Sequence, residues 1–269
     1  MRHRLSILVF AALVAVSCSV KEDRSACPIY VSVKALSDSD CLVSFFALDG
    51  SLLECRFIAA EDMCSGNNVT RLERGEFYVS VLKDKWDMAL RDGQVVYCRE
   101  GREAAPVYAF SLLRTETSQT SRYSDDVLVE GVLKKQHALV RVRFTSESEE
   151  DFPYAVEVSG RRNGFDLVTL EGCEGEYLVE PLTDDLLQTE FILTRQSPDD
   201  PIYLILNDSE SGEEKTRIDL GSYITQAGYD WSAESLDDME ITVDYSQLAI
   251  SVTVTPWEEE NIEIFGNDE

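Results

Sequence analysis

The sequence is poor in the residues that most enzyme sites and nucleic-acid-binding surfaces need. Only two of its 269 residues are histidines, and one of these, His3, lies at the extreme N-terminus. The 24 basic residues face 51 acidic ones, which gives a net charge of −27 at pH 7. A surface of this sign repels phosphate backbones and anionic lipid head groups, so we expect neither nucleic-acid binding nor electrostatic membrane binding.

Long hydrophobic runs are absent after the first residues. The N-terminus reads Met1-Arg2-His3-Arg4, then an apolar run over residues 5–16, then Ser17-Cys18, which is the order of an export signal. As a helix this run would span only about 18 Å, whereas the hydrocarbon core of a bilayer is roughly 30 Å thick. We therefore expect residues 1–17 to be a signal peptide that is removed.

Cys18 indicates which type of export signal this is. It follows Ala15-Val16-Ser17, which resembles a bacterial lipobox, where the cysteine thiol is alkylated by a diacylglycerol and becomes the new N-terminus. The alternative is an ordinary secretory signal that is cut nearby. Without residues 1–17 the chain has 22 basic and 51 acidic residues, a net charge of −29, so a membrane tether must come from lipid.

The segment after Cys18 indicates where in the cell the protein is located. Lys21-Glu22-Asp23 resembles the acidic tract that sends Bacteroidetes lipoproteins to the cell surface. We therefore predict lipidation at Cys18, with the protein anchored in the outer membrane and exposed at the surface.

The cysteines show no metal-binding spacing. Lipidation of Cys18 leaves six thiols, none in a CxxC pair, and five of them precede residue 100. Outside the cytoplasm some could pair, in connectivities that the sequence does not distinguish, and free buried cysteine is the alternative. The six are Cys27, Cys41, Cys55, Cys64, Cys98 and Cys173.

Short runs with apolar residues at alternate positions recur along the chain, which is the period of a half-buried strand. The clearest is residues 248–255, where Leu248, Ile250, Val252 and Val254 face inward. Helix signals are confined to single turns at residues 184–189 and 219–225. The pattern predicts an all-β protein built of sandwiches.

A polar segment at residues 114–126 and a fresh strand from Ala138 divide the chain in two. We predict a signal peptide over residues 1–17, a lipidated tether over 18–27, an N-terminal β-sandwich over 28–134 and a C-terminal β-sandwich over 135–269. The boundary near Lys134-Lys135 carries an uncertainty of about ten residues.

Catalytic and metal-binding residues are not found. His137, the one histidine left after cleavage, has no nucleophile motif and is expected to be an exposed linker residue. Acidic pairs such as Asp199-Asp200 are expected by chance in so acidic a chain, and adjacent strand residues point to opposite faces. Residues 207–212 read as a polar hairpin turn. We predict no enzyme activity, cofactor, metal site or small-molecule substrate.

Two stretches of the sequence resemble a known family. One is Cys18-Ser19-Val20-Lys21-Glu22-Asp23-Arg24-Ser25-Ala26-Cys27-Pro28, directly before a strand, and the other runs from Ile218-Asp219-Leu220-Gly221 through Trp231 to residues 248–255 and Trp257. Together they resemble the anchor, or minor fimbrillin, subunits of Bacteroidales type V fimbriae, the FimB-type family.

This resemblance implies two transthyretin-like (Greek-key) β-sandwich domains, a lipid anchor in the outer membrane and a base on which fimbrial subunits assemble. The expected function is to anchor a fimbria by binding its basal stalk subunit, with β-strand addition as one route. Leu248, Ile250, Val252 and Val254 are the candidate partner-binding residues, and an ordinary last core strand is the alternative. The alternative function is a non-enzymatic surface lipoprotein that binds glycan or protein ligands.

Overall fold

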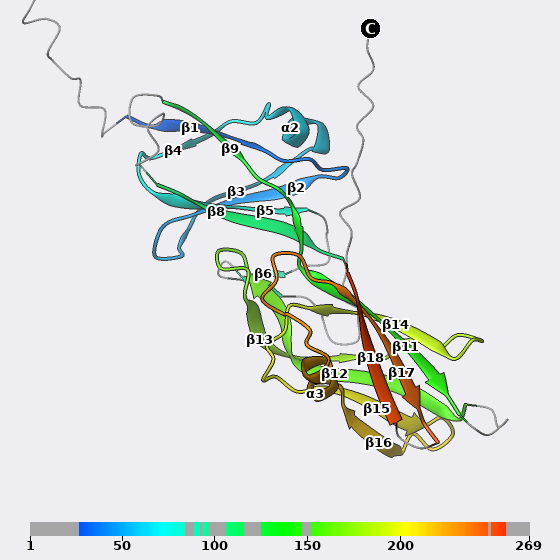
Figure 1. Ribbon diagram of the computed structural model, residues 1–269. Coiled ribbons are helices and arrows are strands. Elements are labelled where there is room, and N and C mark those ends of the chain that lie inside the picture. The colour runs from blue at the N-terminus through cyan, green and yellow to red at the C-terminus, as the bar shows by residue number, and fades with distance from the viewer. Residues whose placement is uncertain are drawn as a thin grey trace, which may run out of the picture.

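The computed structural model describes residues 27–83, 89–91, 94–96, 106–115, 125–146, 152–246 and 249–256. The predicted signal peptide and Cys18 lie outside these residues. The described chain forms four β-sheets and two short helices, so the all-β prediction is confirmed. Figure 1 shows two stacked sandwiches, the first drawn mainly in blue and cyan and the second in green to red.

The first sandwich has a three-stranded sheet, in the order β4-β1-β9, and a five-stranded sheet, in the order β10-β8-β5-β2-β3. The elements are β1 (Ile29–Lys34), β2 (Cys41–Phe46), β3 (Leu52–Ile58), α2 (Ala60–Ser65), β4 (Thr70–Leu72), β5 (Phe77–Lys83), β8 (Tyr108–Arg114), β9 (Asp126–Glu130) and β10 (Lys134–Lys135). Alternate residues of β1, β2 and β5 face inward and are fully buried between the two sheets, among them Val31, Val43 and Val79.

The second sandwich has a four-stranded sheet, in the order β14-β11-β17-β18, and a sheet in the order β16-β15-β12-β7-β6, with β13 also pairing with β12. The elements are β6 (Ala89–Arg91), β7 (Gln94–Val96), β11 (His137–Thr145), β12 (Tyr154–Asp166), β13 (Gly172–Val179), β14 (Gln188–Thr194), β15 (Ile202–Asp208), β16 (Glu214–Asp219), α3 (Leu220–Gln226), β17 (Asp238–Asp244) and β18 (Ala249–Thr255).

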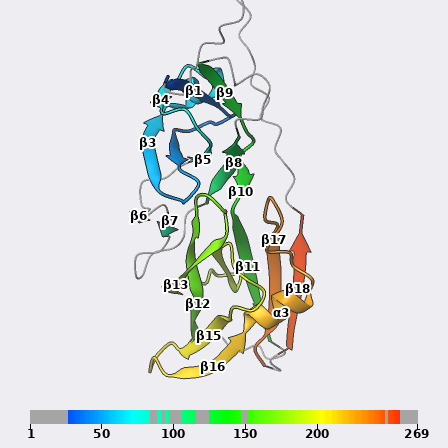
Figure 2. The ribbon, with the colours of Figure 1, turned by 90° about the vertical axis from the view of Figure 1, so that its left-hand side faces the viewer.

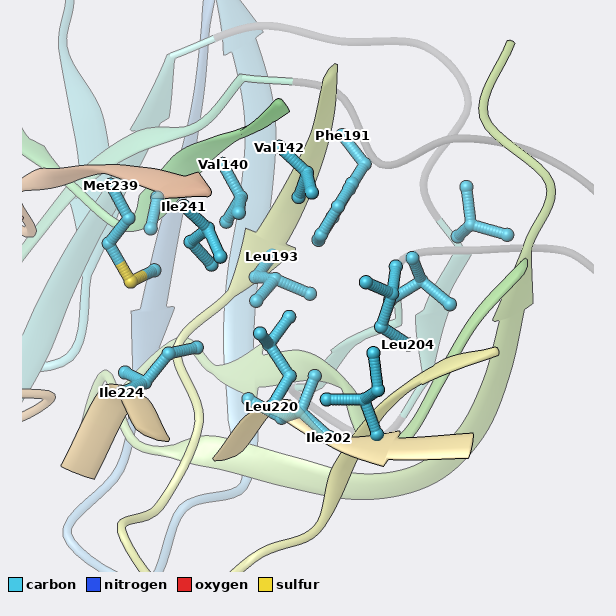
Figure 3. Close-up of a cluster of buried hydrophobic side chains, with 14 of the residues drawn as sticks. Val140, Val142, Phe191, Leu193, Ile202, Leu204, Leu220, Ile224, Met239 and Ile241 are labelled. Carbon is cyan, nitrogen blue, oxygen red and sulfur yellow. The ribbon is translucent and has the colours of Figure 1, made fainter. Parts of the chain in front are cut away.

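The core of the second sandwich lies between these two sheets and under α3. Figure 3 shows Val140 and Val142 of β11 facing Leu204 of β15, with Leu220 and Ile224 of α3 closing one side. Each of these side chains is fully buried. The single helical turn that the sequence predicts at residues 219–225 is confirmed, and Asp219 caps it by accepting a hydrogen bond from the Ser222 N–H at 3.2 Å.

Several elements differ from the sequence pattern, and neither β4 nor helix α2 is predicted by it. β3 was not predicted, because an edge strand with both faces partly in water shows no clean alternation. β12 is one strand of 13 residues, whereas the alternation pattern predicts separate strands at residues 154–158 and 165–170. Residues 184–187 form a turn that leads into β14, where the sequence predicts a helical turn. The turn at residues 207–212 is confirmed, since Asp208 Oδ1 accepts hydrogen bonds from Glu210 and Ser211.

The chain passes between the two sandwiches more than once. The short strands β6 and β7 precede β8 in sequence, yet β7 pairs with β12 of the second sandwich. An apolar cluster lies at the junction, with Phe46, Leu82 and Ala109 from the first sandwich and Phe165 and Leu167 from the second. The boundary near residues 134–135 stays a prediction, because the two halves share this packing.

Candidate functional site

The last described strand, β18, carries the candidate partner-binding residues. It pairs antiparallel with β17 in an unbroken register that runs from Asp244 opposite Ala249 to Asp238 opposite Thr255. Ile250, Val252 and Val254 pack against the core of the second sandwich, whereas Ser251 and Thr253 are exposed. The predicted alternation is therefore confirmed for these three side chains, and Leu248 lies outside the described residues.

These three inward side chains differ from those of the neighbouring strands in one respect. Ile250, Val252 and Val254 are only partly buried, whereas Ile241 and Val243 of β17 are fully buried. The cause is position, because β18 is the outermost strand of its sheet. Within the described part of the chain, no strand pairs with its second edge.

The second edge of β18 has the chemistry of a strand-addition site. A strand edge presents alternating N–H and C=O groups, which a further extended segment can pair with. Alternate residues among the seven of β18 direct their N–H and C=O groups away from β17 and can form this pairing. The exposed side chains of the strand carry only small hydroxyl and methyl groups. Neither proline nor lysine blocks the edge within β18, although both residues commonly protect such edges.

The β17–β18 pair is held firmly at both ends. At one end, Phe144, Phe152, Tyr154 and Tyr245 form a ring cluster with centroids 4.6 to 5.9 Å apart. At the other end, the buried Lys135 ammonium pairs with Asp238, whose Oδ1 also accepts the Leu139 N–H at 2.8 Å. Helix α3 contacts β18 as well. A rigid edge of this kind loses little conformational freedom when a partner binds.

A second feature is a cleft of about 790 Å³ at the junction of the two sandwiches. Leu112 and Val132 line its first-sandwich side, and Arg162, Arg195 and Glu171 line the other. The buried Arg195 guanidinium donates to Gln136 Oε1 at 2.8 Å and to the Ala233 carbonyl at 2.9 Å, so it holds two loops together. Burial lowers the pKa of Arg195 from its ordinary value.

His137 is not the exposed linker residue that the sequence predicts, because it lies at the junction and is only 4% exposed. Its Nδ1 accepts the Val107 N–H at 2.9 Å, and its ring packs edge-on against Tyr108. Burial lowers the pKa of His137 to about 4. The sequence near Lys134-Lys135 looked like a polar linker, but the chain crosses between two packed sandwiches there and buries the ring.

No other chemistry is assembled among the described residues. Within the described ranges, no group of three or more His, Cys, Asp and Glu side chains is placed to hold a metal ion. The described cysteines, Cys27, Cys41, Cys55, Cys64 and Cys173, are free thiols, and Cys98 lies outside the described part. Neither described helix is long and apolar enough to span a membrane.

Comparison with protein families identifies the family of this chain. Residues 108–263 match the family described as "Fimbrillin-A associated anchor proteins Mfa1 and Mfa2". This is more than half of the chain, and it includes β8 to β18. The chain belongs to this anchor family. A search of curated protein sequences finds no match.

Solved structures share the fold of this anchor-family chain. The fimbrial anchor protein Mfa2 from Porphyromonas gingivalis superposes with a TM-score of 0.62 at 12% identity, over 86% of this chain and 98% of that one. A protein of Bacteroides thetaiotaomicron proposed to bind polysaccharide gives 0.60 at 14% identity, over 87% and 99%. A proposed adhesin of Bacteroides ovatus gives 0.59 at 13% identity, over 89% and 96%.

Family membership confirms the resemblance to fimbrial anchors and gives the chain an anchor-type role at the cell surface or membrane. A role of this kind is structural and needs no catalytic residues. The lipid on Cys18, the bound stalk subunit and the partner-binding strand are finer statements, and they stay predictions.

Proposed function

We propose that this anchor-family chain is an outer-membrane lipoprotein that holds a fimbria to the cell by binding its basal stalk subunit along β18. The observation that carries this proposal is the open edge of β18, with Ile250, Val252 and Val254 only partly buried beside it. An incoming strand would pair with the main chain of β18 and cover the half-exposed row of apolar side chains.

The experiment changes the apolar row while the main chain stays intact. Val252→Asp puts a charge into the row that an added strand would cover, so it should weaken binding about tenfold or more. The matched control is Leu186→Asp, which makes the same kind of change at a side chain that is 72% exposed, outside β18.

The readout is the amount of fimbrial stalk subunit that co-purifies with the full chain from fimbriated cells, together with electron microscopy of attached fimbriae. Melting temperatures of both variants show whether the fold persists. If Val252→Asp alone loses the co-purified stalk subunit and the attached fimbriae, the proposal is supported. If both variants fold and retain them equally, the proposal is contradicted.

Tethering is tested separately at Cys18. Cys18→Ala removes the thiol that a lipid would modify, so the chain should leave the membrane fraction and fimbriae should detach from cells. A multi-acyl anchor contributes about 0.8 kcal/mol for each buried methylene, and the acidic protein surface offers no substitute. A variant that stays membrane-bound with fimbriae still attached would refute both the lipid and the anchor hypotheses.

The alternative function is ligand binding by a surface lipoprotein, and the 790 Å³ cleft at the junction is the observation that favours it. One structural relative is a protein proposed to bind polysaccharide. Screening the full chain on a glycan array tests this alternative. Binding that Glu171→Gln weakens, with stalk-subunit binding unchanged, would assign the cleft to glycan.

A further inference from the structure

Strand β3 is an outer edge of the first sandwich. Its exposed side chains are more apolar than those of edge strands that are protected against pairing. It pairs with β2 on one side, and no strand in the described ranges pairs with its other side. Leu53 is 49% exposed and Phe57 is 64% exposed. Figure 2 shows β3 along the outer margin of the first sandwich. An exposed apolar edge of this kind is a template for pairing with another chain.

The charges of β3 have a symmetrical arrangement. Glu54 and Arg56 flank Cys55, and they share one face of the strand because successive side chains alternate. Arg56 Nη1 donates to the Val69 carbonyl at 2.6 Å, which ties the guanidinium to the segment that leads into β4. Among the described residues, neither Glu54 nor Arg56 has an oppositely charged partner within 4.0 Å.

We propose that β3 pairs with β3 of a second copy of this chain, antiparallel and centred on Cys55. In this register Glu54 of each copy lies opposite Arg56 of the other, so the two-fold axis creates two ion pairs. In the same register the two Cys55 side chains face each other. Directly opposed pairs of opposite charge stabilise an antiparallel sheet.

The charge pattern selects both the occupant and the register. A two-fold interface brings the same patch of both copies together, so it must be self-complementary. Moving the register by two residues in either direction puts Glu54 opposite Glu54, or Arg56 opposite Arg56, and like charges in those positions are destabilising. The irregular step in the β2–β3 pairing lies between Leu52 and Glu54, so the strand around Cys55 is regular.

Cys55 gives a direct test of this pairing in the full chain. Directly opposed residues have Cβ atoms about 4.5–5.5 Å apart, which lets a disulfide form after a small adjustment. Membranes that carry the full chain are treated with copper-phenanthroline, which oxidises neighbouring thiols to a disulfide, and are analysed on non-reducing gels. We expect a dimer band that Cys55→Ser abolishes and that Cys27→Ser, the control at an exposed thiol outside β3, leaves in place.

Charge reversal tests the register in the same assay. Glu54→Arg and Arg56→Glu should each lower the cross-linked fraction about tenfold, because each makes two like-charge pairs. The double variant E54R/R56E exchanges the charges and should restore the dimer. Absence of a Cys55-dependent band, or a double variant no better than the singles, would overturn the proposal. Because β3 is separate from β18, stalk-subunit binding should be unchanged in all these variants.

Discussion

At the scale of single residues, many polar side chains buried in the described part of the protein form hydrogen bonds within it. Asn68 is an example, because its Oδ1 accepts the Val33 N–H at 2.9 Å and its Nδ2 donates to the Val33 carbonyl at 2.7 Å. The side chain thereby joins β1 to the segment that follows α2, and Nδ2 also donates to the Asp62 carbonyl at 3.0 Å. A buried polar group satisfied in this way stabilises the fold and leaves nothing free for chemistry.

His137 makes the stability of the protein depend on pH. Its folded-state pKa of about 4 lies below the ordinary value of 6.5 because burial penalises the charged ring. Between these two values the unfolded chain binds a proton that the folded chain excludes, so stability is full above pH 6.5 and falls towards pH 4. At pH 5 we expect the loss to be roughly 2 kcal/mol.

The measurement is urea unfolding of the wild type and of His137→Gln at pH 7.5 and pH 5. Glutamine keeps an acceptor for the Val107 N–H but does not titrate. The variant should therefore lose less free energy of unfolding than the wild type between these pH values. If both proteins lose the same free energy of unfolding, the pH dependence comes from carboxylates and not from His137.

At the scale of elements, the surfaces that we propose to bind other chains lie on edge strands. Among the described residues, β18 and β3 each pair with another strand on one side only, yet β18 presents a regular row of apolar side chains and β3 presents charges arranged about Cys55. A strand edge binds through its main chain, so its specificity comes from these side chains.

Helix α3 depends on a glycine for its position. A Cβ at Gly221 would lie 3.0 Å from the Asp200 carbonyl oxygen and 3.1 Å from the Ile202 nitrogen, both of them backbone atoms. We expect Gly221→Ala to lower the free energy of unfolding by about 1–3 kcal/mol, although alanine is the better helix former. Urea unfolding measures this, with Gly75→Ala as the control, because a Cβ there meets no atom within 4 Å. A stabilised Gly221→Ala would show that α3 can move away from β15.

At the scale of the whole molecule, the two sandwiches are coupled through the apolar cluster at their junction. Phe165 is fully buried there against Leu82 and Ala109 of the other sandwich, and the Ser80 hydroxyl donates to the Leu167 carbonyl. An anchor must transmit force from a bound polymer to its tether. A packed junction suits that task better than a flexible linker.

Phe165→Ala should therefore lower the free energy of unfolding by about 3–5 kcal/mol and split thermal unfolding into two transitions. Phe144→Ala is the control, because Phe144 is buried within the second sandwich alone and its loss should destabilise without uncoupling the first. Differential scanning calorimetry distinguishes the two results. A single transition in both variants would mean that the other contacts at the junction suffice to couple the sandwiches.

By itself, the sequence determined the all-β class, the inward row of β18, helix α3 and the resemblance to fimbrial anchors. These follow from local patterns, since the period of two, the capping aspartate and the motifs at both ends can each be read along the chain. Tertiary structure alone decided that β18 and β3 are edges, that His137 is buried and that β7 joins the second sandwich. Strand order and burial depend on contacts between residues far apart in sequence, and a local pattern carries no information about them.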